Sequence, residues 1–253
     1  MKVSLITVSH NSANTIRDTF DSVLNQTYKD IEYIVVDGFS QDGTVSIIRE
    51  YEPEFARRMC WISEPDKGLY DAMNKGIKMA SGEIVGIINS DDFYHRNDTI
   101  ERIVSSFIED KTIEIIFGDV RYVNSTDLER TVRYYSSKKF NPSLFRFGFM
   151  PHHQTFFTYR YNYERIGLYQ IDYKITADFE LLIRFLYKNR LKYKYLNFDF
   201  LKMRNGGIST RPKNHLLLNQ ELVRSCRANG IYTNMLIIYM KYFLKIFEFV
   251  FTK

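Results

Sequence analysis

The sequence lacks several features that would assign a chain to a functional class at once. It has 2 cysteines among 253 residues, too few for a disulfide framework. Cys60 falls in an apparent strand, where we expect it to be a small buried side chain. The motifs GxGxxG and GxxxxGK(S/T) do not occur, which disfavours dinucleotide-binding and P-loop sites. We find no nucleic-acid-binding motif, so nucleic acid is not an expected partner.

The N-terminus shows no targeting signal. Met1 leads directly into a short strand-like segment, without the long apolar stretch and small-residue cleavage site of a signal peptide. We therefore expect a protein of the cytosol or of the cytosolic side of a membrane.

Charge is distributed unevenly along the chain. Residues 1–133 carry 15 Lys and Arg against 23 Asp and Glu, whereas residues 134–253 carry 20 against 7. A basic, aromatic-rich C-terminal half suits an anionic partner, either phosphate groups or a membrane surface. The composition as a whole, 45% hydrophobic and 26% charged, is that of a globular chain with one large domain or two small ones.

The first 92 residues alternate between strand-like and helix-like segments. Short β-branched runs predict strands, and apolar residues at helical spacing predict helices. The predicted strands are residues 2–8, 31–36, 59–62 and 84–88. Three helices are predicted between them: one that starts at residue 16, one over residues 44–51 and one over residues 69–80. This order predicts an α/β fold with a mostly parallel sheet and right-handed crossovers.

The pattern is less regular beyond residue 92. We expect helices over 98–107 and 178–188, a strand over 113–117 and a mobile loop at Gly206-Gly207. In the final segment, 234–251, most residues are large and apolar, and the polar ones share one helical face: Asn234, Lys241, Lys245 and Glu248. Three charges argue against a spanning helix, so we expect an amphipathic helix in a membrane interface. Docking on the protein itself or on a partner subunit is the alternative.

Polar residues follow each predicted strand of the first half. They are Ser9 and Asn11, then Asp37, then Glu64 and Asp66, then Asp91 and Asp92. Ligands of open α/β sheets bind beyond the carboxyl ends of the strands, so these residues are expected to share one cleft. Paired acids at the end of a buried strand are costly without a cation, and they predict a divalent metal with a phosphorylated substrate. Two solvated turn residues are the alternative.

Five motifs occur in a fixed order along this half, at residues 3–15, 22–27, 37–44, 67–76 and 89–92. Together they resemble family 2 glycosyltransferases, densely over residues 1–92 and more loosely over 150–210. The resemblance implies a GT-A fold, with a Rossmann-like, mostly parallel sheet flanked by helices. It also implies a nucleotide-sugar donor and inversion at the anomeric centre. We expect a donor-binding half (1–95), an acceptor-binding half (96–212) and a membrane-associated amphipathic helical tail (213–253).

The resemblance also implies roles for individual residues. Donor binding is expected of Ser9, Asn11, Asp37, Asp66, Asn74 and Asp91, and Asp92 is expected to hold Mn²⁺ or Mg²⁺. A carboxylate at Asp37 can accept the N3–H of uracil, which favours UDP. His153 and Gln154 are expected on the acceptor or diphosphate side, with a structural role at a strand start as the alternative. A zinc site at His152-His153 lacks further spaced ligands.

An inverting transfer needs a base that takes the proton of the acceptor hydroxyl. It needs no acid, because the metal stabilises the charge of the leaving nucleoside diphosphate. Asp178 lies in a segment that resembles the one bearing the family's base, and Glu180 is the second candidate. The alternative for Asp178 is a helix N-cap.

These inferences predict a metal-dependent, inverting glycosyltransferase of the hexosyltransferase type. We expect it to move a sugar from a UDP donor to a hydroxyl of a lipid-linked glycan acceptor in bacterial surface-polysaccharide assembly. We expect it to lie peripherally on the cytoplasmic face of the inner membrane. A nucleotidyltransferase-like enzyme is one alternative, although the early glycine-rich loop it needs is absent. A non-catalytic sugar- or membrane-binding module is another, although Asp37, Asp91, Asp92 and Asp178 are all present.

Overall fold

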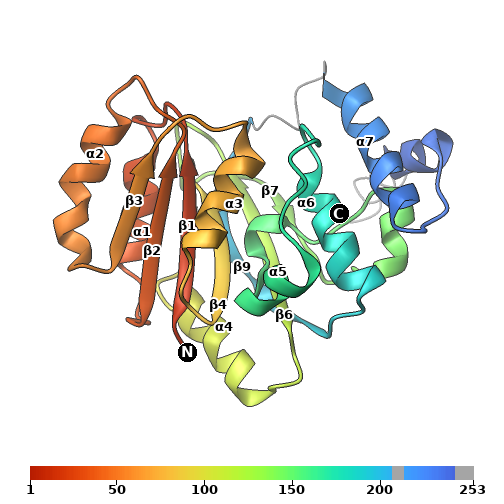
Figure 1. The fold of residues 1–253 in the computed structure, drawn as a ribbon, viewed down its shortest axis with the longest axis horizontal. Helices are drawn as coiled ribbons and strands as arrows, with labels where there is room; N and C mark the ends of the chain where they lie inside the picture. The colour runs from red at the N-terminus through yellow and green to blue at the C-terminus, as the bar shows by residue number, and fades with distance from the viewer. Residues whose placement is uncertain (207–213, 243–253) are drawn as a thin grey trace.

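The protein is described by a computed structural model that covers residues 1–206 and 214–242. The described residues form a nine-stranded sheet in the order β3-β2-β1-β4-β8-β6-β9-β5, with β7 paired to β6 off this path (Figure 1). The strands are β1 (Val3–Ser9), β2 (Ile31–Asp37), β3 (Met59–Ser63), β4 (Ile84–Asn89), β5 (Asp92–Tyr94), β6 (Ile115–Val123), β7 (Thr131–Tyr135), β8 (Phe157–Tyr159) and β9 (Tyr193–Arg204).

Helices cover both faces of this sheet. The α-helices are α1 (Ile16–Leu24), α2 (Thr44–Tyr51), α3 (Leu69–Met79), α4 (Thr99–Glu109), α5 (Arg160–Ile166), α6 (Ala177–Leu182) and α7 (His215–Ala228). Short 3₁₀ turns are η1 (Glu52–Phe55), η2 (Pro142–Phe147) and η3 (His153–Thr155), and α6 continues as a π-helical turn, η4 (Ile183–Lys188).

The first four strands pair in parallel, as predicted, in the order β3-β2-β1-β4. Successive side chains of a strand point to opposite faces, so β1 divides its residues between two cores. Leu5 packs with the helices α1, α2 and α4 on one face. Ile6 packs on the other face with α3 and with the C-terminal helices α6 and α7. The strands carry apolar residues on both sides because both faces are covered.

The second half of the sheet is mixed. Strand β8 lies between β4 and β6 and is antiparallel to both, whereas β6 and β9 are parallel. A hairpin joins β6 to β7, and β5 pairs antiparallel with the end of β9, where Asp92 lies opposite Met203. This pairing attaches the end of the predicted Asp91-Asp92 motif to a strand more than a hundred residues later.

Element positions agree closely with prediction in the first half, and α2 has the predicted bounds. The prediction for Cys60 was wrong, because its side chain is exposed. It lies in β3, which is an edge strand of the sheet, so packing around it is incomplete.

The C-terminal residues pack onto the main body in an unexpected way. Leu222 of α7 belongs to the same apolar core as α3 and α6. A helical segment follows at 235–242, with Ile238 buried and Lys241 95% buried against Asn219. Its outward side chains are apolar, namely Leu236, Tyr239 and Met240. The polar face predicted for this tail therefore faces the protein at Lys241, while Lys245 and Glu248 lie outside the described residues.

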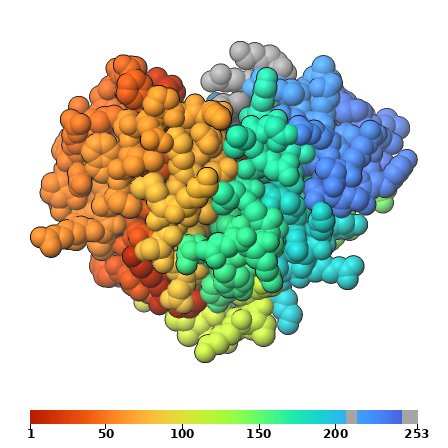
Figure 2. Space-filling model, in the orientation of Figure 1, coloured from red at the N-terminus to blue at the C-terminus, as the bar shows by residue number. Residues whose placement is uncertain are grey.

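Figure 2 shows this C-terminal part on the side of the molecule opposite the first strands and α2, with α3 and the segment around α5 between them. Among residues 1–206 and 214–242, no helix is long and apolar enough to cross a membrane.

Candidate active site

Asp37 ends β2 at the carboxyl edge of the parallel strands. Its side chain is fully buried. Oδ1 accepts hydrogen bonds from the hydroxyls of Ser9 (3.0 Å) and Ser40 (2.5 Å), and Oδ2 accepts from the Ser63 hydroxyl (2.7 Å) and the Ser40 amide (2.9 Å). Four donors satisfy the approximately four acceptor sites of a carboxylate. Asp37 therefore organises the strand ends and the loop that follows β2.

The loops beyond β1 and β2 are held in left-handed backbone conformations. Asn11 has φ +51°, its amide donates to Ser40 Oγ (2.8 Å), and its Oδ1 accepts from the Gln41 amide (2.9 Å). Phe39 has φ +61° and a side chain that is 55% exposed. Left-handed conformations of residues other than glycine are uncommon and persist where the surroundings enforce them. The result is a rigid rim that presents an amide side chain and an aromatic ring.

Asp66 lies directly against Gly38. A Cβ at Gly38 would come within 2.4 Å of Asp66 Oδ2, so any larger residue there would displace the Asp66 side chain. Asp66 Oδ1 accepts from the Gly68 amide (2.7 Å) just before α3. The end of β2 and the entry to α3 are thereby joined, as the common-cleft prediction requires.

Hydroxyl contacts join the β1 loop to the turn between β4 and β5. Ser12 Oγ lies 2.7 Å from Ser90 Oγ, and Thr15 Oγ1 donates to the Ser90 carbonyl (2.9 Å). Asp91 follows at the exposed tip of the turn. Arg204, at the end of β9, donates to the Asp91 carbonyl and pairs with Asp18 of α1. This arginine was not predicted from the sequence.

Asp92 is almost fully buried, and its two oxygens differ sharply. Oδ2 accepts from Gln154 Nε2 (2.7 Å), whereas Oδ1 has no hydrogen-bond partner within the part of the chain that the structure describes. Burial, together with the negative charge of Asp91, raises the pKa of Asp92 well above its ordinary value. An unpaired buried carboxylate oxygen is the group that a cation would satisfy.

The donor set at this position suits a hard divalent cation. The described residues contain no group of three or more His, Cys, Asp or Glu side chains placed to hold a metal. Mg²⁺ and Mn²⁺ need few protein carboxylates when substrate phosphates supply the other oxygens. Asp92, with Asp91 beside it, therefore fits a metal that binds together with a diphosphate.

Asp178 lies in the first turn of α6 and is also buried. Its Oδ2 lies 3.1 Å from His153 Nδ1, and its Oδ1 accepts from the Phe179 amide (2.8 Å) and the Tyr70 hydroxyl (3.2 Å). Burial alone would raise the pKa of Asp178, but the charge and hydrogen bond of His153, with the bonds from Phe179 and Tyr70, lower it. The N-cap alternative for Asp178 was wrong, because the N-cap of α6 is Thr176 and Asp178 is the second residue of the helix.

One 3₁₀ turn, η3, connects the two acids. His153 contacts Asp178, and the next residue, Gln154, contacts Asp92. Gln154 is fully buried, and its Oε1 also accepts from the Asn89 amide at the end of β4 (3.2 Å). Gln154 thus lies behind Asp92, while the His153 side chain keeps 18% of its surface exposed.

Two predicted candidates have contacts that the sequence did not suggest. The side chain of Asn74 pairs with both backbone groups of Tyr169, at 2.8 and 2.9 Å, so it joins α3 to the loop before α6. Its role toward a donor stays a prediction. Glu180, the second candidate base, is 99% buried and bonded to Arg184 at 2.9 Å. This buried ion pair favours Asp178 over Glu180.

Two positioning residues were missed in the sequence. Tyr70 contacts Asp178 from 108 positions away. Glu221 of α7 accepts from the amides of residues 174–176, at 2.8 to 3.0 Å, and so holds the loop that leads into α6. The helical period predicts the buried face of such residues, but no local pattern predicts a partner so distant in sequence.

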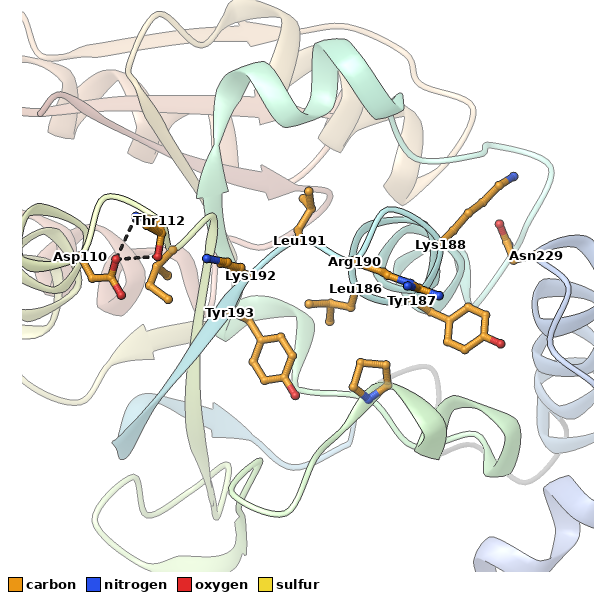
Figure 3. Close-up of a pocket in the computed structure, with 12 residues that line it drawn as sticks. Asp110, Thr112, Leu186, Tyr187, Lys188, Arg190, Leu191, Lys192, Tyr193 and Asn229 are labelled. Atoms are coloured by element: carbon orange, nitrogen blue, oxygen red, sulfur yellow. Dashed lines mark hydrogen bonds between the residues drawn. The ribbon is translucent and has the colours of Figure 1, made fainter.

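A cavity of about 830 Å³ opens at the other end of β9, lined by Asp110, Tyr187, Lys188, Arg190, Lys192 and Tyr193 among others (Figure 3). In Figure 3 the side chains of Lys188, Arg190 and Lys192 point in different directions and do not converge on one point. This cavity contains none of the predicted site residues.

Comparison with known proteins identifies the family to which this chain belongs. The model of the family described as glycosyl transferase family 2 matches residues 4–167. An uncharacterized glycosyltransferase of Mycobacterium tuberculosis is 36% identical over 185 residues, covering 72% of this chain and 68% of that protein. A PGL/p-HBAD biosynthesis glycosyltransferase of Mycobacterium bovis is 29% identical over 201 residues, covering 77% and 73%.

Solved structures share the fold. The structure of S. aureus TarS 1–349 in complex with UDP-GlcNAc has a TM-score of 0.71 and 18% identity, covering 92% of this chain and 68% of that one. The mannosyltransferase PcManGT from Pyrobaculum calidifontis, in complex with GDP-Man and Mn²⁺, has a TM-score of 0.64 and 21% identity, covering 90% and 63%. These likenesses confirm the predicted GT-A fold.

Proposed function

Because the chain belongs to glycosyl transferase family 2, we propose that it moves a sugar from a UDP donor to a hydroxyl of a glycan acceptor with inversion. One observation carries the proposal. Two buried carboxylates, Asp178 and Asp92, contact the adjacent η3 residues His153 and Gln154, and their surroundings shift their pKa values in opposite directions. Such a divergence is the usual sign that two acids have different chemical roles.

We assign the donor to the loops around Asp37, Ser9 and Asn11. Asp37 holds the hydroxyls of Ser9 and Ser40 in place, and the exposed Phe39 ring offers the base a stacking surface. Asp66 lies on the diphosphate side, at the entry to α3. The support is that Asp37, Asp66 and the Ser12–Ser90 contact gather at one edge of the sheet.

The metal belongs at Asp92, with Asp91 beside it. When bound there, Mn²⁺ or Mg²⁺ neutralises charge on the departing diphosphate. Gln154 fixes the orientation of the Asp92 carboxylate through Oδ2, which leaves Oδ1 for the cation. Arg204 holds the backbone of Asp91 in place against α1.

Transfer itself is a single displacement at the anomeric carbon. Asp178 supplies the negative charge that draws the proton from the acceptor hydroxyl. The lowered pKa of Asp178 keeps this carboxylate ionised at neutral pH. No second carboxyl group is required as an acid, since the leaving group is a diphosphate.

The test is a donor panel. Purified protein would be incubated with UDP-sugars, Mn²⁺ and a lipid extract containing membrane-linked glycans, and UDP release would be measured. We expect release that depends on one donor and on the extract and that is abolished by EDTA. No release with any nucleotide sugar, together with unchanged UDP binding in Asp92→Ala, would contradict the proposal. Anomeric NMR of the product tests inversion.

We also propose that the protein works on the cytoplasmic face of a membrane, where its acceptor is linked to lipid. The support is the helical segment 235–242, whose outward side chains Leu236, Tyr239 and Met240 are 76%, 40% and 45% exposed. Its lysine, Lys241, donates instead to Asn219 inside the protein. An outward apolar face on a strongly basic half suits an anionic bilayer.

Vesicle sedimentation tests this attachment. Leu236→Gln combined with Met240→Gln should weaken binding to vesicles of anionic and zwitterionic phospholipid at least tenfold, because each large apolar side chain that enters the interface contributes about 1.5–3 kcal/mol. Ile108→Gln, at an equally exposed apolar residue of α4, is the matched control and should bind like the wild type. Equal binding by all three proteins would refute membrane attachment through this face.

A further inference from the structure

A row of paired residues crosses four strands of the sheet and ends at the proposed metal site. Arg133 of β7 lies opposite Tyr122 of β6, and Tyr122 lies opposite Met203 of β9. Met203 in turn lies opposite Asp92 of β5. Side chains of directly paired residues point to the same face of a sheet, and neighbouring strands are about 4.8 Å apart. The backbone of Arg133 is therefore about 14 Å from that of Asp92 along the sheet, on the same face.

Two tyrosine rings hold the guanidinium of Arg133. Its Cζ lies 5.4 Å from the ring centroid of Tyr122 and 5.7 Å from that of Tyr135. The His152 ring packs edge-on against both tyrosines, with centroid distances of 6.2 and 6.0 Å, and His152 directly precedes η3. The Tyr135 hydroxyl donates to the Met150 carbonyl (2.7 Å). The aromatic rings thus connect Arg133 to the turn that contacts both acids of the site, and a guanidinium held in this way loses little freedom when it binds a ligand.

The same hairpin carries a second arginine that already has a charged partner. Arg121 of β6 lies over the Tyr134 ring (5.7 Å), and its Nε donates to Asp199 Oδ2 (2.7 Å). The Arg133 side chain is exposed, and no residue in the described ranges forms a hydrogen bond or an ion pair with its guanidinium. Arg121 therefore contributes to the sheet, whereas the N–H donors of Arg133 are available to a ligand.

An arginine in this position selects an oxyanion. Its guanidinium is a planar fork of donors that matches two oxygens of a carboxylate or a phosphate. The donor diphosphate is assigned to the metal at Asp92 and to Asp66 at the entry to α3. Arg133 lies three strands from Asp92 along the row, in the half of the chain expected to bind the acceptor. An oxyanion bound by Arg133 therefore belongs to the acceptor.

We propose that Arg133 binds an oxyanion of the acceptor and so restricts the enzyme to anionic acceptors. This inference rests on the proposed function. The oxyanion is a phosphate that links the glycan to its lipid or a carboxylate of an acidic sugar, since both present two oxygens to the guanidinium. Because Arg133 is fixed relative to η3, an oxyanion bound there sets how far the acceptor extends toward Asp178 and the donor.

NMR of the arginine side chain tests this contact without turnover. Protein saturated with UDP and Mg²⁺, so that the donor site is filled, would be titrated with geranyl phosphate, methyl glucuronide or the neutral methyl glucoside. The ¹³Cζ resonance of Arg133, assigned by its absence in Arg133→Lys, should shift with one of the two anions and stay unchanged with the glucoside. A shift with geranyl phosphate identifies the lipid phosphate, and a shift with methyl glucuronide identifies an acidic sugar. No shift with either anion, or an equal shift with the glucoside, would overturn the proposal.

Substitutions test the same contact during transfer. With the lipid extract as acceptor, Arg133→Gln should raise the half-saturating amount of extract at least tenfold, because it removes hydrogen bonds between two charged groups. The KM of the UDP-sugar should change less than twofold and kcat less than threefold. Arg133→Lys keeps the charge without the planar fork and should fall between the two proteins. The matched control is Arg49→Gln in α2, which removes a guanidinium 5.8 Å from the Trp61 ring and should behave like the wild type.

Failure of this proposal differs from failure of the proposed function. If the wild type releases UDP and Arg133→Gln is saturated by the same amount of extract, Arg133 does not bind the acceptor, although the proposed function stands. A rise in the KM of the UDP-sugar alone would assign Arg133 to the donor and also overturn the proposal. If the wild type releases no UDP with any nucleotide sugar, the proposed function fails, and the NMR titration then tests Arg133 by itself.

Discussion

Asp92 and Asp178 are buried to a similar degree, with exposed fractions of 1% and 7%, yet their surroundings treat their charges in opposite ways. Asp92 has one neutral amide donor, one unpaired oxygen and an acidic neighbour, so its pKa is raised. Asp178 has a histidine, a tyrosine and a backbone amide, so its pKa is lowered. The difference shows that partners, and not depth of burial, set the charge of each acid. The surroundings of Asp92 disfavour its charged form, whereas those of Asp178 favour it.

The largest expected effect comes from removing the charge at the Asp92 end. Asp92→Asn should lower kcat/KM with Mn²⁺ at least 100-fold and abolish the rise in melting temperature that Mn²⁺ gives the wild type. Without Mn²⁺, the same substitution is expected to leave the melting temperature unchanged or to raise it. Because the folded-state pKa of Asp92 is raised, ionisation destabilises the fold as pH rises above the ordinary carboxyl value. Asparagine removes this penalty, so the metal-free variant should melt no lower than the wild type at pH 7.5.

Thermal unfolding with and without Mn²⁺ checks this expectation. Asp30→Asn, at a carboxylate that is 59% exposed, is the control and should respond to Mn²⁺ like the wild type. A full Mn²⁺ response in Asp92→Asn would contradict the assignment of the metal to Asp92.

The second prediction breaks the contact that orients Asp92. Gln154→Leu leaves both Asp92 oxygens and the Asn89 amide without protein partners. Each buried group left unsatisfied costs about 1–3 kcal/mol, so we expect the free energy of unfolding in urea to fall by at least about 2 kcal/mol. A change below about 0.5 kcal/mol would mean that water or a shifted side chain replaces Gln154.

The third prediction concerns pH and His152, the residue that precedes the η3 turn. Burial, aided by the charges of His153 and Arg133, lowers the pKa of His152 to about 3. The unfolded chain takes up this proton below about pH 6.5, so stability is fully present above that pH and falls as the pH drops toward 3, by at most about 1.4 kcal/mol per unit.

His152→Phe tests that dependence because it retains an aromatic ring beside Tyr122 and Tyr135. The free energy of unfolding in urea should fall less between pH 7.5 and pH 5.5 in the variant than in the wild type. Equal losses would mean that other groups cause the acid sensitivity.

The smallest expected effect lies at the Asp178 end. Tyr70→Phe removes the single O–H that the Ile175 carbonyl (2.6 Å) and Asp178 Oδ1 (3.2 Å) share, but leaves His153 in place. We expect a loss of about 1 kcal/mol in stability and a decrease of a few-fold in kcat. Tyr161→Phe, at an exposed tyrosine, should change neither. A loss of kcat as large as that of Asp92→Asn would mean that Tyr70 takes part in the chemistry.

The first half of the fold could be predicted because its signals are local. The periods of strands and helices placed α2 and the four parallel strands almost to the residue. The second half could not, because β8 enters the sheet antiparallel between two strands that are distant in sequence. Cys60 was misassigned for the same reason, since only the strand order reveals that β3 is an edge.

The helical segment 235–242 shows what a helical pattern in the sequence cannot predict. The spacing of Asn234 and Lys241 predicts that the two residues share a helical face, but it does not predict which way that face points. Asn219 of α7 accepts from the Lys241 ammonium at 2.9 Å, so the lysine turns inward and Leu236 turns outward. A helical pattern sorts residues into faces, and the surface it packs against decides which face is buried.

The sequence alone determined which acids lie at the strand ends, that they share one edge, and that the chain resembles glycosyltransferases of family 2. Only the tertiary structure decided which hydrogen-bond partners surround each acid. Gln154 is 62 positions from Asp92, and Tyr70 is 108 positions from Asp178. The charge of a buried carboxylate depends on the few donors within hydrogen-bonding distance, and those donors are brought together by the fold and not by the order of residues.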